Sequence, residues 1–173
     1  MGPVVVTVRK IRVFAGFEPD EQLRRGGFPQ RKVHLAAGMG VDYGDARTGI
    51  AMSDLLCSIV GSTTVIHSRK DDKTIAEIQK LIMQNGVTEI VVGLPKNMNG
   101  TEGPRAEVCK EFAEKLREAT GLPVNMWDER RTTVEAHNIL STHNYHGQKR
   151  KNTVDAVAAS LILEGYLNFK KRT

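Results

Sequence analysis

The sequence is poor in cysteine. Its two cysteines, Cys57 and Cys109, lie 52 residues apart in a chain of 173, and neither has a second thiol close to it. That spacing argues against a zinc ribbon, a redox-active cysteine pair and a disulfide framework. His137, His143 and His146 lie in a polar stretch without cysteine neighbours, where surface histidines are more common than zinc ligands. We therefore interpret both cysteines as reduced packing residues and predict no zinc site.

Long apolar runs are also missing. The longest contain only a handful of residues, against the roughly 18 that a membrane-spanning helix requires. The run Val4–Val8 is followed by Arg9, Lys10 and Arg12, and it lacks the apolar region and small-residue cleavage site of a secretory signal. We therefore expect a cytoplasmic protein without membrane contact. A length of 173 residues favours one domain over two.

The positive charge is concentrated at the N-terminal end of the chain. Residues 1–34 hold seven Lys and Arg against three Asp and Glu, so that of the net charge of +5 only +1 belongs to residues 35–173. The leading segment has scattered glycines and prolines and no pattern for a packed core. We interpret residues 1–34 as a basic, disordered extension and residues 35–173 as a single domain. The basic pI by itself is therefore weak support for contact with nucleic acid.

The apolar pattern of the domain predicts five strands and four helices. Strands are expected at 35–43, 48–53, 62–67, 89–95 and 124–127, and helices at 73–85, 104–120, 132–143 and 154–169. The first strand is rich in Ala and Gly, which are poor β-formers. Short turns join the first three strands into an antiparallel meander, whereas the later strand–helix–strand units favour parallel pairing. The predicted fold class is α/β, a ribonuclease H-like five-stranded mixed sheet flanked by helices.

The run VDYGDARTGIAMSD, residues 41–54, is the first candidate site. Asp42 ends an apolar strand at a glycine turn, so its carboxylate is held at the end of a sheet, where a metal or a phosphate can reach it. An Asx turn that merely caps the strand is the structural alternative. We favour a catalytic role because other acidic residues recur at apolar boundaries further along the chain.

Asp128, Glu129 and Asp155 are those acidic residues. Asp128 and Glu129 end an apolar strand, and alternation along that strand points only one of them toward Asp42. We favour Asp128, because it continues the strand directly. Asp155 is expected in the first turn of the last helix, where a capping pair with Asn152 is the structural alternative. Three carboxylates from separate elements suit Mg²⁺ or Mn²⁺ and a two-metal hydrolysis of phosphodiesters. We name Asp42, Asp128 and Asp155 as metal ligands.

Several residues are candidates for contact with nucleic acid. The loop Gly93–Glu107 is rich in glycine and leads into a helix whose N-terminus attracts phosphate, and it carries Lys96 and Arg105. The loop does not have the sequence of a P-loop. Exposed ion pairs between the acids at 128–129 and the neighbouring arginines would contribute only about 0 to 1 kcal/mol to stability. That is too little to explain why acidic and basic residues gather there. The remaining candidates are Arg130, Arg131, Tyr145, Lys149, Arg150 and Lys151.

Four ordered segments resemble the signatures of the YqgF family, RuvC-like nucleases with a ribonuclease H fold. They are VDYGDARTGIAMSD, VVGLPKNMNGTEGPRAE, WDERRTT and KRKNTVDAVAASLILEGYL, and the match runs from about Met39 to Phe169. The resemblance implies a cytoplasmic, metal-dependent nuclease that processes the 5′ end of precursor 16S ribosomal RNA. It places the catalytic acids on Asp42, on Asp128 or Glu129, and on Asp155.

Three alternatives to this function remain open. Resolvases place a glutamate at the end of the fourth strand, where this chain has Gly93, Leu94 and Pro95, which argues against cleavage of branched DNA. Actin-like ATPases and sugar kinases share an Asp-x-Gly strand turn but need two such domains. A non-catalytic RNA-binding assembly factor would keep the basic segments. We expect precursor rRNA as the partner, with branched DNA as the alternative, and a monomer or a homodimer.

Overall fold

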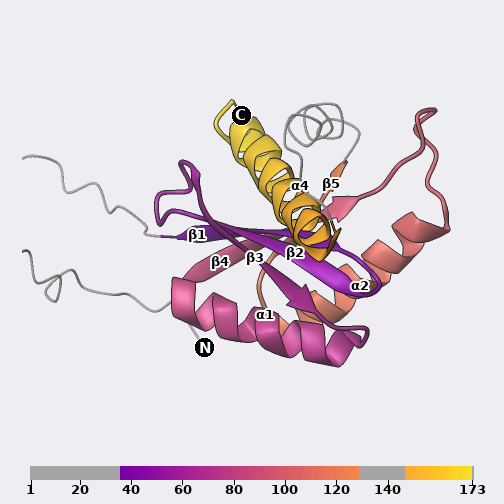
Figure 1. The fold of residues 1–173 in the computed structure, drawn as a ribbon. Helices are drawn as coiled ribbons and strands as arrows, with labels where there is room; N and C mark the ends of the chain where they lie inside the picture. The colour runs from indigo at the N-terminus through magenta and orange to yellow at the C-terminus, as the bar shows by residue number, and fades with distance from the viewer. Residues whose placement is uncertain (1–35, 129–146, 173) are drawn as a thin grey trace, which may run out of the picture. The chain divides into compact units, whose positions relative to one another are not determined.

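The computed structural model describes residues 36–128 and 147–172. Its elements follow one another as three strands, a helix, a strand, a helix, a strand and a long final helix (Figure 1). Their bounds are β1 Ala37–Tyr43, β2 Arg47–Ser53, β3 Val60–His67, α1 Asp71–Asn85, β4 Val87–Leu94, α2 Pro104–Thr120, β5 Val124–Asp128 and α4 Gly147–Lys170. The extension and its boundary at residue 34, and the helix predicted at 132–143, lie outside the described residues and stay predictions.

The five strands form one mixed sheet in the order β3-β2-β1-β4-β5. β1 pairs antiparallel with β2, and β2 pairs antiparallel with β3, whereas β1 pairs parallel with β4 and β4 parallel with β5. The predicted meander and the predicted parallel half are both confirmed. The carboxyl ends of β1, β4 and β5 consequently lie at the same edge of the sheet. Among the described residues, no helix is long and apolar enough to cross a membrane.

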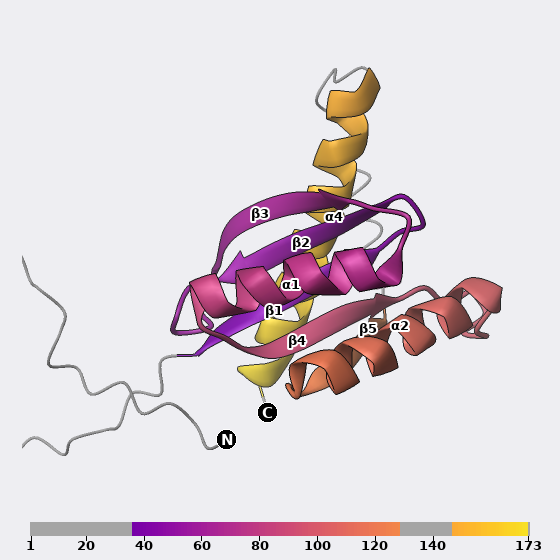
Figure 2. The same ribbon diagram turned by 90° about the horizontal axis from the view of Figure 1, so that it is seen from below.

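The helices cover the two faces of the sheet unequally. Figure 2 shows α1 and α2 side by side on one face and α4 crossing the other. The face under α1 and α2 carries the larger core, in which Met39, Val41, Ile50, Phe112 and Leu116 are all buried. The face under α4 carries a smaller cluster that includes Ala51, Val91, Ala159, Ile162 and Leu163. Every second residue of a strand points to the same face, so residue number decides which cluster a side chain joins.

The glycines of β1 and β2 explain why a poor β-forming sequence makes the central strand. A Cβ atom on Gly40 would lie 2.7 Å from the backbone oxygen of Ala159, and one on Gly49 would lie 2.6 Å from the carbonyl carbon of Asp155 and closer still to its oxygen. No side chain fits at either position, so these glycines let the backbone of α4 lie directly on the sheet. The low β-propensity of these strands is offset by the close packing of α4 that the missing side chains permit.

The helix ends follow the sequence signals in α1 and α2 but not in α4. Gly86 and Gly121 cap α1 and α2 in the left-handed conformation, with φ of 65° and 68°, as the Asn-Gly and Thr-Gly pairs predict. The prediction that the last helix begins at Val154 is wrong, because α4 begins at Gly147. Residues 149–151 are good helix formers and extend the helix toward its N-terminus. Asn152 and Asp155 are therefore interior helical residues rather than a capping pair.

A candidate active site at the carboxyl end of strand β1

Asp42 lies at the end of β1 and faces α4. Residues an even number of positions apart in a strand, which we say have the same parity, point to the same face of the sheet. Asp42 has the same parity as Gly38 and Gly40, which contact α4. Its partner on β2 is Gly49, which lies against Asp155. Burial raises the pKa of Asp42 from 3.8 to about 6, repulsion from the Asp155 carboxylate adds to that rise, and the Arg105 guanidinium opposes both effects. The strand thus holds a carboxylate in a partly dehydrated position beside a second one.

Asp155 reaches the same place from the helix. It lies about two turns into α4, and its Oδ2 atom accepts a hydrogen bond from Nε of Arg47 at 2.5 Å. The side chains of Arg47 and Asp155 are 27% and 18% exposed, so the ion pair is partly shielded from water. Arg47 is the cation that compensates the charge of Asp155 here.

The residue after Asp42 anchors the turn. The Tyr43 ring stacks on Phe112 with a centroid distance of 3.9 Å, and its hydroxyl donates to Oδ1 of Asp71 at 2.6 Å. Arg105 donates to the backbone oxygen of Tyr43 at 2.5 Å and lies over its ring. Contacts from both α1 and α2 therefore fix the strand end. Rigid support from packed neighbours keeps the Asp42 carboxylate in one place.

Asp128 lies at the same edge of the sheet as Asp42, but its parity in β5 is that of residues that point to the opposite face. It pairs with Leu94 of β4, whose other neighbour is β1, so the backbones of Asp42 and Asp128 lie two strand spacings, or about 10 Å, apart. Val124 and Met126, which share its parity, pack into the core under α1 and α2. Trp127 packs on the α4 side. Glu129, the next residue in the chain, lies outside the described residues.

The donor atoms of this site fit a divalent cation. Asp42 and Asp155 offer hard carboxylate oxygens, which Mg²⁺ and Mn²⁺ prefer, and their mutual repulsion is what a bound cation relieves. Within residues 36–128 and 147–172, no three His, Cys, Asp or Glu side chains gather closely enough to hold a metal. The described part of the site supplies two of the three expected carboxylates.

Lys96 and Arg105 are both held by acidic neighbours. Lys96 lies 3.3 Å from Oε1 of Glu102 and pairs with that residue across a short bridge in the loop, and Lys110 bonds the same carboxylate. Arg105 pairs with Asp45. The structure therefore gives these two side chains local partners, and their contact with nucleic acid stays a prediction.

The other candidates for contact with nucleic acid lie in and before α4. Residues 149–151 lie in the first turns of this helix, not in a loop as predicted. Arg130, Arg131 and Tyr145 lie outside the described residues.

Arg47 is the functional candidate that the sequence reasoning missed. It begins β2 and has the parity of Gly49 and Ala51, so it faces α4 beside the two acids. Its position five residues after Asp42, across a tight turn, was the available signal. Its partner, Asp155, is 108 residues away in the sequence, so no local pattern indicates the ion pair.

Comparisons with known proteins agree with this geometry. The model of the RuvX family, also called YqgF and described as Holliday junction resolvases, matches residues 36–169. The chain belongs to the RuvX family. The resemblance of the four sequence segments to this family is thereby confirmed. The matched range contains both acids, Arg47 and the glycines that seat α4.

Two similar relatives and one solved structure extend the RuvX match. A protein of Carboxydothermus hydrogenoformans, named "Putative pre-16S rRNA nuclease", is 46% identical over 134 residues, which cover 78% of this chain and 97% of that protein. A protein of the same name from Halothermothrix orenii is 44% identical over 134 residues, covering 78% and 96%. The Fowlpox virus resolvase, solved with Holliday junction DNA, superposes with a TM-score of 0.50 at 8% identity, covering 78% and 98%. The predicted ribonuclease H-like fold is confirmed.

Proposed function

We propose that this RuvX-family chain is a nuclease that hydrolyses phosphodiester bonds with the help of Mg²⁺ or Mn²⁺. The observation that carries the proposal is the convergence of Asp42 and Asp155, two carboxylates from a strand end and a helix that repel each other in a partly buried place. Structural carboxylates are normally arranged to avoid such repulsion. Perturbed acids at a sheet end are typical of a catalytic site.

Asp42 and Asp155 would hold the ions, and Arg47 would assist them. Bound divalent ions would supply an activated water and stabilise the leaving oxygen. The Tyr43 anchor keeps the Asp42 oxygens in position. Arg47, which bonds Asp155, would exchange that contact for a phosphate oxygen of the substrate, which its guanidinium binds well.

The middle carboxylate is proposed to be Glu129 rather than Asp128. The metal-ligand role of Asp128 expected from the sequence is weakened by its parity, which is that of the core residues Val124 and Met126. If the alternation of β5 continued by one residue, Glu129 would point as Trp127 does, to the side of Asp42 and Asp155. Asp128 remains the alternative ligand, because a residue at a strand end has more freedom than one inside the strand.

Substitutions at these two positions separate the alternatives. Glu129→Gln is expected to lower the rate of cleavage by about a thousandfold, since loss of a ligand removes several kcal/mol of transition-state stabilisation. Asp128→Asn is expected to change the rate by less than about tenfold. Single-turnover cleavage rates in saturating Mn²⁺ provide the measurement. An inactive Asp128→Asn variant beside an active Glu129→Gln variant reverses the assignment.

Precursor 16S rRNA is the proposed substrate, cleaved at its 5′ end. The names of the two relatives support it, and the absence of a glutamate from the sequence Gly93, Leu94 and Pro95 argues against junction resolution. Cleavage of branched DNA is the second candidate, because the family description names Holliday junction resolvases. A non-catalytic RNA-binding assembly factor is the third. We further propose a cytoplasmic monomer or homodimer, whose catalytic domain is residues 35–173.

One cleavage assay distinguishes these functions. The full chain is incubated with Mn²⁺ or Mg²⁺ and either a precursor 16S rRNA fragment that carries its 5′ extension, the mature fragment, or a four-way DNA junction. Shortening of the precursor alone supports the rRNA function, and cleavage of the junction alone supports resolution. Tight binding of the precursor without cleavage in either ion identifies an assembly factor and contradicts the nuclease.

The basic turns that begin α4 are proposed to bind phosphates. Replacing Lys149, Arg150 and Lys151 with alanine should weaken binding of nucleic acid and reduce the slope of log K against log[salt] by about 0.7 for each single-strand phosphate that these side chains neutralise. Binding isotherms at several salt concentrations measure the slope. A matched triple substitution at Lys70, Lys73 and Lys80, in and beside α1, should leave the slope unchanged. An unchanged slope in both variants contradicts the proposal.

A further inference from the structure

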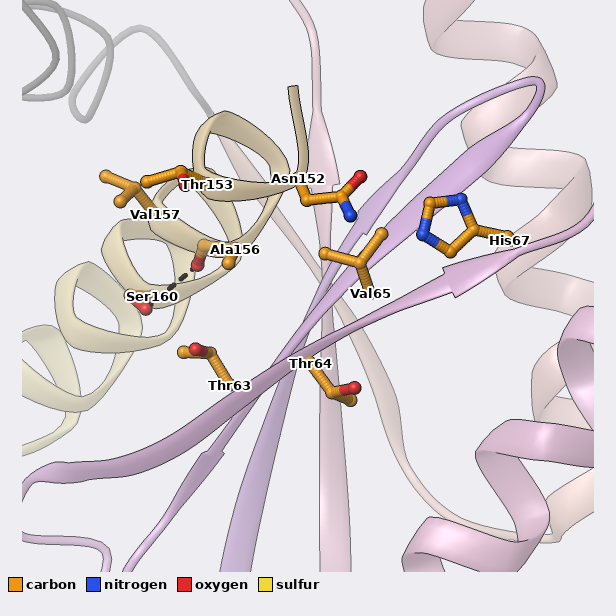
Figure 3. Close-up of a pocket in the computed structure, with 9 residues that line it drawn as sticks. All are labelled: Thr63, Thr64, Val65, His67, Asn152, Thr153, Ala156, Val157 and Ser160. Carbon is orange, nitrogen blue, oxygen red and sulfur yellow. Dashed lines mark hydrogen bonds between the residues drawn. The ribbon is translucent and has the colours of Figure 1, made fainter. Parts of the chain in front are cut away.

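A polar groove lies between edge strand β3 and α4, on the same face of the sheet as Asp42 and Asp155. Its volume is about 530 Å³, within the range of sites that hold small ligands. Figure 3 shows side chains from the strand and from the helix on its two sides. The lining residues are Thr63, Thr64, Val65, His67, Asn152, Thr153, Ala156, Val157 and Ser160.

The lining is rich in neutral hydrogen-bonding groups. Threonine hydroxyls, the Asn152 amide and the His67 imidazole are set among Val65, Ala156 and Val157, while the Ser160 hydroxyl donates to the backbone oxygen of Ala156. None of the nine lining residues carries a carboxylate, and none is a Phe, Tyr or Trp. Hydroxyls and amides are the groups that contact phosphate oxygens and sugars without reading sequence. His67 is the only aromatic ring among the lining residues, so polar contacts rather than base stacking predominate in the groove.

The groove adjoins the candidate active site on one side. On α4, Asn152 lies three residues before Asp155 and Ala156 lies one residue after it. Both line the groove, while Asp155 faces β2. On the sheet, His67 of the groove pairs with Arg47, whose guanidinium bonds Asp155. The same turns of α4 therefore separate the groove from the two acids.

Basic residues directly precede the groove residues of α4 in the sequence. The helix turn that precedes Asn152 carries Lys149, Arg150 and Lys151 in the sequence, and Figure 2 shows the beginning of α4 extending past β3. A run of Lys and Arg next to these residues in the sequence favours a polyanion as the ligand.

We propose that the β3–α4 groove binds the sugar–phosphate backbone of single-stranded nucleic acid, next to the nucleotide that is cleaved. The inference rests on the proposed nuclease function for the direction of the strand, but the binding itself needs neither metal nor cleavage. Neutral hydrogen-bonding groups in the groove bind sugar and phosphate oxygens. The site is sequence-tolerant, because such contacts do not read the bases.

Two neighbouring residues of the edge strand provide a matched test. Thr63 and Ser62 are both exposed, but Thr63 lines the groove and has the parity of Ala51 under α4, whereas Ser62 pairs with Met52, whose side chain lies in the opposite core. Thr63→Glu brings a negative charge next to the proposed phosphates, and Ser62→Glu places the same charge on the other face. Binding of fluorescent single-stranded RNA, and of DNA of the same sequence, is measured by anisotropy with the full chain in a chelator, where no metal-dependent cleavage occurs.

Thr63→Glu is expected to weaken binding of the strand about three- to tenfold, which is the scale of one repulsive charge pair near a surface. Ser62→Glu should stay within about twofold of the parent. The reciprocal pair, Thr63→Lys and Ser62→Lys, should tighten binding only at Thr63 and covers the case in which a glutamate variant fails to fold. Equal affinities for the Thr63 and Ser62 variants overturn the groove assignment. Because binding is measured without metal, a chain that shows this contrast but cleaves nothing refutes the nuclease and keeps the groove.

Discussion

Asp42→Asn is expected to abolish metal-dependent cleavage, by about a thousandfold or more, without lowering the stability of the fold. The amide keeps the size of the carboxylate and its place at the strand end, so the Tyr43 anchor is unaffected. What is lost is the charge that would hold a divalent ion opposite Asp155, which corresponds to several kcal/mol of transition-state stabilisation. Single-turnover rates in Mn²⁺ and calorimetric Mn²⁺ binding both measure the loss.

The difference in stability between the parent and this variant depends on pH with a definite sign. The pKa of Asp42 is raised from 3.8 to about 6, so between these values the folded protein binds a proton that the unfolded chain has already released. The Asp42 carboxylate therefore destabilises the parent progressively as pH rises from about 4 to 6, and the full penalty, on the order of 1 to 3 kcal/mol, applies above that range. The asparagine variant lacks this penalty. It should be at least as stable as the parent at about pH 8 and equal to it near pH 3.5.

Asp45→Asn is the matched control, because it removes an acid three residues away in the same turn. Its side chain is 84% exposed and pairs with Arg105, whereas Asp155 pairs with Arg47. Cleavage by this variant should stay within a few-fold of the parent. Full activity in Asp42→Asn, or equal losses in both variants, would show that the metal site is elsewhere.

Gly49→Ala is expected to destabilise the protein by about 3 kcal/mol and to disturb the site at the same time. A Cβ at this position would lie 2.6 Å from the carbonyl carbon of Asp155 and closer still to its oxygen. Both contacts are with helix backbone, which cannot turn aside as a flexible side chain can. Relief requires α4 to move away from the sheet, and overpacking of this kind costs roughly 1 to 3 kcal/mol or more.

The two effects of Gly49→Ala are measured separately. Thermal unfolding should show a fall in Tm of roughly 6 to 12 °C for a domain of this size. Mn²⁺ affinity, measured at temperatures well below the Tm, should also fall, because the shift of α4 carries Asp155 away from Asp42. Gly61→Ala is the control, since a Cβ there meets nothing closer than 3.8 Å. A Gly49→Ala variant as stable as Gly61→Ala would mean that α4 does not lie on the sheet as described.

The sequence by itself determined the local features whose causes are local. The glycines after Asn85 and Thr120 predict the ends of α1 and α2, because a left-handed residue must follow there and glycine adopts it most readily. Hydrophobic periodicity and short turns predict the mixed sheet, and the strand-end position of Asp42 makes it the first site candidate. Four ordered motifs are enough to identify the family.

Only the tertiary structure decided which side chains meet. Gly40 in β1 and Gly49 in β2 are unfavourable for a strand in isolation, and they become necessary because the backbone of α4 lies where a side chain would be. The start of α4 at Gly147 moves Asp155 from a helix cap to an interior position, where it meets Arg47, 108 residues away. Alternation along β5 gives Asp128 the orientation of the core residues Val124 and Met126, on the opposite face from Trp127. Each of these outcomes depends on contacts between segments distant in the sequence, and local preference contains no information about such contacts.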